Sequence, residues 1–300
     1  MNLFALVAAF GGGVFGAAIG GLYAFVMTGF MAIAGAVAAM AGGADLAVGS
    51  IAFGSYFGPH IAFVGGVAAA AFAANKKKLI DGGADIVSPL NGTADASVLV
   101  VGGVFGVLGF LIQYVYGTVL GLNTDTVAMT VATCGILCRF IFGSTGLVGK
   151  YEGSGPRTWI TGGKGLVYNI VLGASVGLMV GGVGVSLINQ VGMENAALIT
   201  ANFPSICFGI AAVTLILAEF GLAGPTTHHI ALPAANAAVL CAVKYNNLWM
   251  GVIMGVVWGI ITSLVGDFMG NAFNSHCDSH IDPPAMTIFS MTFIIFALFS

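Results

Sequence analysis

Apolar stretches of roughly 16–24 residues alternate along the chain with shorter polar segments. A helix needs about 20 apolar residues to cross the hydrocarbon core of a bilayer, so each stretch has the length of a membrane-spanning helix. The pattern predicts an all-α polytopic membrane protein with about ten transmembrane helices. Their approximate ranges are 3–21, 23–42, 58–75, 97–120, 126–143, 165–188, 202–222, 226–243, 248–270 and 284–299.

Two of the predicted helices, 58–75 and 226–243, are short and rich in small residues, and a Gly-Pro pair stands at or just before the start of each. Proline fixes φ and lacks an N–H group, so it suits the first turn of a helix. The segment 44–57 is too weakly apolar for a full span, and we expect a re-entrant or broken piece there. The pattern therefore predicts interrupted helices at two corresponding places.

The two halves of the chain carry the same motifs in the same order. Gly-Pro followed by His-Ile-Ala occurs at 58–62 and again at 224–231, where three extra residues are inserted. An Asp-x-x-Ala-Met-Thr motif occurs at 125–130 and at 282–287. Four glycines also recur at a distance of 149 residues, pairing Gly102, Gly106, Gly117 and Gly121 with Gly251, Gly255, Gly266 and Gly270. Shared Gly/Ala-rich composition explains such spacings by themselves, but it does not explain the order of the motifs.

We interpret residues 1–150 and 151–300 as two copies of a five-helix unit within one integrated membrane domain. Because five is odd, the second copy enters the membrane from the opposite side. Inverted repeats with broken helices at matching positions are typical of many transporters, and their binding sites lie near the bilayer midplane. The sequence thus predicts two inverted five-helix repeats with short or broken helices at their interface.

Composition supports a lipid environment and excludes several functions. Hydrophobic residues make up 58% of the chain and charged residues 6%, which is too few charges for a soluble surface. The 47 glycines indicate close helix packing, and flat Gly/Ala faces favour a homo-oligomer. The net charge of −3 provides no basic stripe for nucleic acid.

The basic residues predict the orientation in the membrane. Seven of the eight lie in or beside the segments 76–96 and 144–164, which face the same side if ten helices span. By the positive-inside rule this side is cytoplasmic, so both termini are expected outside. Lys244 is the exception. We expect a location in the plasma or inner membrane.

Ionisable and polar residues inside apolar stretches are costly to bury, so they are candidates for solute contact. The candidate substrate-binding residues are His60, Thr226, Thr227, His228, His229 and Asn236. The alternative is that the histidines only hydrogen-bond the broken helices, and that Asn236 only satisfies backbone freed by Pro233.

Asp125 and Asp282 stand just before apolar helices, with Thr130 and Thr287 one turn further inside. Ion or proton coupling is one hypothesis for these four residues. A carboxylate in this position is also typical of a helix N-cap, which is the interpretation that we favour for both.

The segment 276–282 holds the densest set of metal-type ligands, but it lacks the spacing of an established zinc motif. A metal ion is the only cofactor that the sequence suggests, and a solvated loop or a pH-sensitive gate is the preferred alternative. The candidate ligands are His276, Cys277, Asp278 and His280.

The sequence thus favours a transporter or channel for a small polar or anionic solute, with H⁺ or Na⁺ coupling as an open option. The alternatives are a membrane-embedded metalloenzyme that uses the His276 to Asp282 segment, and a membrane scaffold or partner subunit. No catalytic residue is assigned, and no P-loop motif is present.

Overall fold

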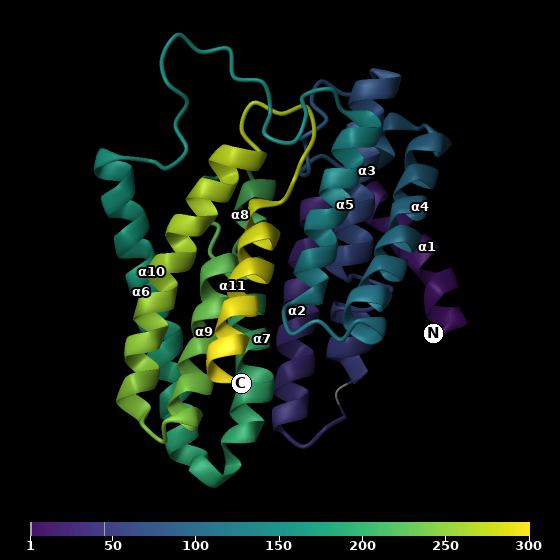
Figure 1. Cartoon of the computed structure of the whole chain (residues 1–300). Helices are drawn as coiled ribbons and strands as arrows, with labels where there is room; N and C mark the ends of the chain where they lie inside the picture. The colour runs from purple at the N-terminus through teal and green to yellow at the C-terminus, as the bar shows by residue number, and fades with distance from the viewer. Residues whose placement is uncertain (1, 45) are drawn as a thin grey trace.

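The computed structural model describes residues 2–44 and 46–300, and within these ranges the chain is helical and contains no β-strand (Figure 1). The all-helical prediction is confirmed. The first half contains α1 (Leu3–Ile19), α2 (Gly21–Met40), η1 (Val48–Ala52), η2 (Pro59–Phe63), α3 (Val64–Phe72), η3 (Ala73–Lys77), η4 (Leu90–Thr93), α4 (Ala96–Gln113), η5 (Tyr114–Val119) and α5 (Thr126–Phe142). The second half contains α6 (Gly163–Val191), η6 (Met193–Asn195), α7 (Ala196–Val213), α8 (Ile216–Glu219), α9 (His228–Lys244), α10 (Leu248–Phe273) and α11 (Pro283–Phe299).

Several helices have the length and composition of membrane spans. Within the described ranges five helical stretches are long and apolar enough to cross a bilayer. Helices α1, α5 and α11 have 17 residues each, about 26 Å at 1.5 Å per residue, slightly less than a core of about 30 Å. Large apolar side chains cover the outside, with Phe4 90% and Trp249 76% exposed. This surface is compatible with surrounding lipid. The five stretches are Gly21–Met40, Ala96–Val119, Gly163–Val191, Met193–Glu219 and Leu248–Phe273.

The two segments that begin near a Gly-Pro pair start differently. Pro59 occupies the first turn of the π-helical segment η2, as its fixed φ predicts. In the second half the chain stays non-helical after Pro225, and α9 begins at His228 instead of at 226. The predicted re-entrant segment 44–57 contains the short π-helical turn η1 followed by irregular chain. Asp45, within that prediction, lies outside the described residues.

Helices α1 and α4 approach through glycine. A Cβ atom on Gly106 would lie 2.9 Å from the Cα atom of Gly13, and one on Gly102 would lie 2.8 Å from the carbonyl oxygen of Gly13. A real Cβ atom essentially never approaches a heavy atom of a residue elsewhere in the chain to within 3.0 Å. The two backbones are therefore in direct contact at this crossing.

Helices α6 and α10 make the same contacts in the second half. A Cβ atom on Gly259 would lie 2.9 Å from the Cα atom of Gly177, and one on Gly255 would lie 2.7 Å from the carbonyl oxygen of Gly177. Gly102 and Gly106 thus correspond in their contacts to Gly255 and Gly259.

This correspondence corrects the register expected from the sequence. The sequence comparison pairs Gly102 with Gly251, 149 residues later, whereas the contacts pair it with Gly255, 153 residues later. Glycines follow one another every four residues at 251, 255 and 259. If α10 is shifted along its axis by one helical turn, the next glycine takes the place of the previous one at the crossing, and the close packing is kept.

The two halves meet mainly through two pairs of helices, α2 with α7 and α5 with α11, and α2 also contacts α8. At the first crossing a Cβ atom on Gly29 would lie 2.8 Å from the carbonyl oxygen of Gly209, and one on Gly209 would lie 2.7 Å from that of Gly29. At the second, the hydroxyl oxygen of Thr292 accepts a 3.0 Å hydrogen bond from the N–H of Asp125.

The contact on the other side of the second crossing is nearly equivalent. Gly135 packs on the backbone at Ile281, with a virtual Cβ-to-Cα distance of 3.3 Å. Asp282 and Thr292 stand 157 residues after Asp125 and Gly135, so the contact of Gly135 falls one residue before the position that corresponds to the Asp125 contact.

We predict that Gly106→Leu and Gly255→Leu destabilise the protein, because each side chain would enter a backbone contact. Virtual Cβ atoms there lie 2.9 Å from Gly13 Cα and 2.7 Å from the Gly177 oxygen. Overpacking of this kind costs about 1–3 kcal/mol. Thermal unfolding of the detergent-purified variants measures the loss.

The matched control is Gly182→Leu, because Gly182 lies in α6 but a Cβ atom there meets no atom within 4 Å. Unchanged unfolding temperatures for both test variants would contradict the assigned contacts.

Candidate functional site

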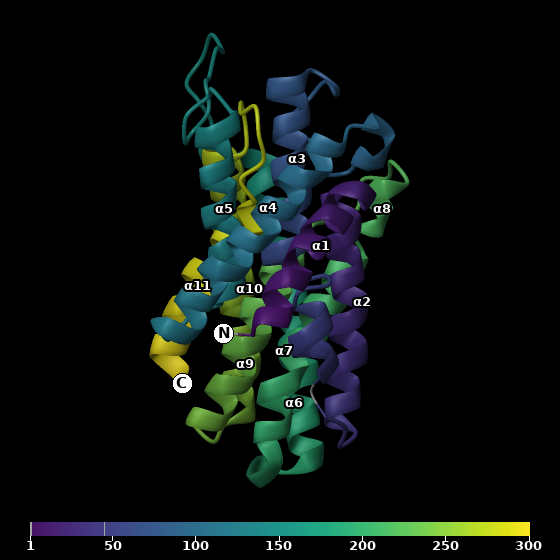
Figure 2. The same cartoon turned by 90° about the vertical axis from the view of Figure 1, so that its right-hand side faces the viewer.

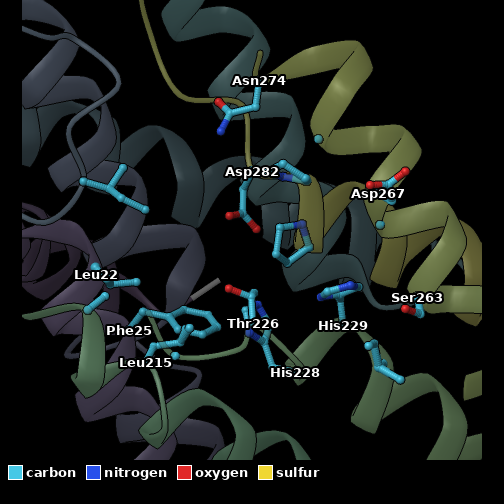
Figure 3. A pocket seen from close by; sticks show the side chains of 18 of the residues that line it. Leu22, Phe25, Leu215, Thr226, His228, His229, Ser263, Asp267, Asn274 and Asp282 are labelled. Carbon is cyan, nitrogen blue, oxygen red and sulfur yellow. The ribbon is translucent and has the colours of Figure 1, made fainter. Parts of the chain in front are cut away.

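A cavity of about 420 Å³ lies between the two halves of the chain (Figure 3). Leu22 and Phe25 on α2 and Phe63 on η2 form one wall. The other walls come from α6, the start of α9, α10 and the start of α11. Sites for small molecules commonly have volumes of about 300–1,000 Å³, so the cavity has the size of a ligand site.

The polar lining of the cavity is one-sided. Its first-half side chains, Leu22, Phe25, Phe63 and Ile86, are all apolar. Every polar side chain comes from the second half, and no Lys or Arg is found among the described lining residues. These polar residues are Asn169, Thr226, His228, His229, Ser263, Asp267, Asn274, His280 and Asp282.

His228 and His229 form the first turn of α9, which follows a non-helical segment, and both line the cavity. Only 4% of His228 and 8% of His229 is exposed, and the Nδ1 atom of each ring has no hydrogen-bond partner. The His228 ring packs against Phe25, with 4.8 Å between ring centroids. The Oδ1 atom of Asn274 is also buried without a partner. Buried polar atoms are normally paired, so these unpaired atoms indicate a place for a ligand.

Two carboxylates complete the polar wall. Asp282 caps α11 by accepting a 2.7 Å hydrogen bond from the N–H of Ala285, and its Oδ1 atom lies 3.1 Å from Nε2 of His280. Asp267 on α10 accepts hydrogen bonds from the backbone N–H and the hydroxyl of Thr161, at 2.7 and 2.6 Å. Thr161 belongs to the linker 143–162 between the halves, so this linker holds one carboxylate of the cavity.

A second, small cavity of about 40 Å³ is lined by Asp125, Asp282 and His228 together. The two aspartates that the sequence paired are therefore brought together at the interface. Both also cap helices as expected, since Asp125 accepts a 2.8 Å hydrogen bond from the N–H of Ala128.

Thr130 and Thr287 line neither of these two cavities. Each hydroxyl instead donates to a carbonyl one turn earlier in its own helix, at 2.8 and 2.9 Å.

Three of the candidate solute-binding residues do not line the 420 Å³ cavity. His60 is buried, and its backbone carbonyl contacts Gly109 on α4. Thr227 occupies the N-cap of α9. The Nδ2 atom of Asn236 donates to the carbonyl of Leu232 at 3.0 Å, whereas the carbonyl that Pro233 deprives of its N–H donor is that of His229.

The register of the helices explains why His60 and His229 differ. Gly65 packs between α1 and α4, and Ala238, 173 residues later, is the residue that meets α6 and α10 in the second half. By this correspondence His60 is equivalent to Pro233, one turn beyond His229. The sequence motif had paired the two histidines directly.

The four candidate metal ligands point to different partners. Asp278 accepts hydrogen bonds from Ser144 and Thr145, while the Cys277 thiol faces the backbone carbonyls of Phe273 and Ser275. His276 packs on the ring of Tyr151, and His280 faces Asp282. Across the described part of the chain, no group of three or more His, Cys, Asp or Glu side chains is arranged to hold a metal ion.

Arg139 has a structural role that the sequence analysis missed. It is 1% exposed, and its guanidinium donates to Oγ and the carbonyl of Ser279 and to the carbonyls of Phe273 and Leu147. These bonds fix the loop 274–282 that leads to Asp282. Its position inside an apolar stretch could have indicated this role. The sequence analysis used Arg139 only as one of the basic residues that predict the orientation in the membrane.

Asp267, Asn169, Ser263 and Asn274 were likewise not predicted as site residues. They lie near the ends of apolar stretches or singly within them, where polar side chains commonly reach the membrane interface. Only the packing of α6 and α10 beside α9 brings them to one cavity.

The fold and this site define a helical protein with a buried polar cavity between two halves. The chain belongs to DUF7973, a family of unknown function whose model matches residues 1–156 and 173–300. Comparison with curated proteins and with solved structures gave no significant match.

We predict that Asp278→Asn lowers the thermal stability of the protein at pH 7. Desolvation raises the pKa of Asp278, but hydrogen bonds from Thr145 and Ser144 outweigh it, so the net pKa is lowered. The carboxylate therefore contributes stability above its unfolded pKa of about 3.9, and this contribution is lost as the pH falls through the folded pKa.

The difference in unfolding temperature between wild type and variant should be largest at pH 7 and should disappear as the pH falls through the lowered pKa of Asp278. Asp81→Asn, a change in an exposed loop residue, is the control. An equal difference at pH 7 and at a pH below this pKa would contradict the role of the charge.

Proposed function

We propose that this protein is an integral membrane transporter or channel that binds a small polar solute in the cavity between its halves. One observation carries the proposal. A cavity of about 420 Å³ in an apolar helical protein is lined by His228 and His229, whose buried Nδ1 atoms have no hydrogen-bond partner. Leaving such groups unpaired costs about 1–3 kcal/mol each, which a hydrogen-bonding solute would recover.

The membrane location is supported by the apolar outer surface and by the five long apolar helical stretches of the described chain. The loops 78–95 and 143–162, which carry basic residues, lie at the same end in both views, and the two termini lie away from it (Figures 1 and 2). We therefore propose that this end is cytoplasmic and that both termini are outside.

The inverted repeat is supported by the equivalent contacts of the two halves. A twofold axis in the membrane plane requires each contact between the halves to occur twice. Gly29 and Gly209 contact each other reciprocally, and at the α5–α11 crossing Asp125 contacts Thr292 while Gly135 packs on Ile281, next to Asp282. We propose that residues 1–150 and 151–300 are the two units and that the solute path runs between them.

Asp125 and Asp282 are the proposed coupling residues, because both line the small cavity beside His228. Each carboxylate caps a helix, so a bound H⁺ or Na⁺ would act directly on a helix end at the interface. The metalloenzyme alternative is not proposed further, because its candidate ligands are directed to separate partners.

The proposal predicts that proteoliposomes take up a small polar solute through this cavity. Uptake of radiolabelled ethanolamine, glycerol and glycolate is measured against empty liposomes. At least one should enter faster through the wild type, and His229→Ala should slow that uptake about tenfold, since a lost buried hydrogen bond costs about 1–3 kcal/mol.

Tyr245→Ala, at the opposite end of α9 and exposed, is the control and should transport like the wild type. Uptake of all three solutes at the rate of empty liposomes would contradict transport and favour a scaffold role. Unchanged uptake in His229→Ala would remove the cavity from the path.

A further inference from the structure

Resting on the proposed function, we infer that the solute of the interface cavity is a small organic cation with an ammonium group and an apolar body. The sequence by itself favoured a polar or anionic solute because of the positive ends of helices. The charges and shape of the cavity argue for a cation.

The cavity lining is negatively charged. It contains the carboxylates of Asp267 and Asp282 and, among its described residues, no Lys or Arg. The donors that reach these carboxylates are the N–H and hydroxyl of Thr161, the N–H of Ala285 and the ring of His280.

Even with His280 protonated, one negative charge stays without a counter-charge. The other two imidazoles that line the cavity, His228 and His229, carry no fixed charge of the kind that Lys or Arg would supply. A carboxylate in an apolar surrounding is costly unless a positive charge accompanies it. A cationic solute supplies that charge.

The N-terminal end of α11 does not offer its positive dipole to an anion. Asp282 caps this end and accepts a hydrogen bond from the N–H of Ala285. An anion would also lie in the same cavity as two carboxylates. Repulsion between these like charges opposes anion binding.

The unpaired atoms of the wall suit a donor group. The Oδ1 atom of Asn274 is an acceptor, and the Nδ1 atoms of His228 and His229 are acceptors when Nε2 carries the proton. An ammonium group provides three N–H donors and no acceptor.

The shape of the cavity separates an organic cation from a bare metal ion. About 420 Å³ is far more than one ion fills, and no metal-holding cluster occurs in the described residues. Leu22, Phe25 and Leu215 lie on one side of the cavity, and His229, Ser263 and Asp267 lie on the other (Figure 3). An amphiphilic cation would place its apolar body on the first side and its ammonium group on the second.

The test compares three probes of similar size and different charge at pH 7, namely butylammonium, butyramide and butyrate. Binding to the full protein in lipid nanodiscs is measured by isothermal titration calorimetry. Butylammonium should bind at least about tenfold more tightly than the other two, because a charge-assisted hydrogen bond is worth about 1.5–3 kcal/mol.

Asp282→Asn should weaken butylammonium binding about tenfold, while the fold is kept because asparagine is as good an N-cap as aspartate. Asp267→Asn should do the same. Asp81→Asn, outside the cavity, should bind like the wild type. Unfolding temperatures report whether each variant is folded.

Binding of butyrate or butyramide as tight as that of butylammonium, no binding of butylammonium, or unchanged binding in both cavity variants would overturn the cation assignment. Uptake of glycerol or glycolate that depends on His229 would keep transport and reject the cation. Butylammonium binding without uptake of any solute would keep the cation site and reject transport.

Discussion

Backbone contact at glycine is the constraint on which the rest of the structure depends. Gly13 and Gly177 each sit against two glycines of the neighbouring helix, and Gly29 and Gly209 bring α2 and α7 together. Without side chains between them, the backbones at these crossings pack in close van der Waals contact, which holds the helices together. This packing fixes α10 beside α6 and α9, and thereby gathers Asp267, Ser263 and His229 at one cavity.

The polar groups near the cavity are held from the end that carries the basic loops. Arg139 donates hydrogen bonds to Ser279 in the loop 274–282 and to Phe273 just before it. Asp278 of the same loop accepts hydrogen bonds from residues 144 and 145. Thr161 of the linker holds Asp267 on the cavity wall. Movement of the linker would thus change the hydrogen bonds of one cavity carboxylate directly, which couples this end of the molecule to the site.

The two halves differ in chemistry although their glycine contacts are alike. The first half contributes only apolar side chains to the 420 Å³ cavity, and the second contributes all of its polar ones. Three extra residues precede His229 in the second half, and the chain before α9 is non-helical. Two imidazoles, those of His228 and His229, therefore stand at the start of α9 and line the cavity. The first half has no counterpart there, and the carbonyl of His60 faces α4 instead.

The sequence by itself determined the helices, their approximate ends and the two aspartate caps, because these depend on local hydrophobicity and on the residues next to each helix start. It also identified His228, His229 and Asp282 as candidates, since polar residues are conspicuous in apolar stretches. Only the tertiary structure decided the helix register and the cavity. Glycines spaced every four residues fit in more than one register, so the sequence did not show that His60 lies away from the cavity while Asp267 lies on it.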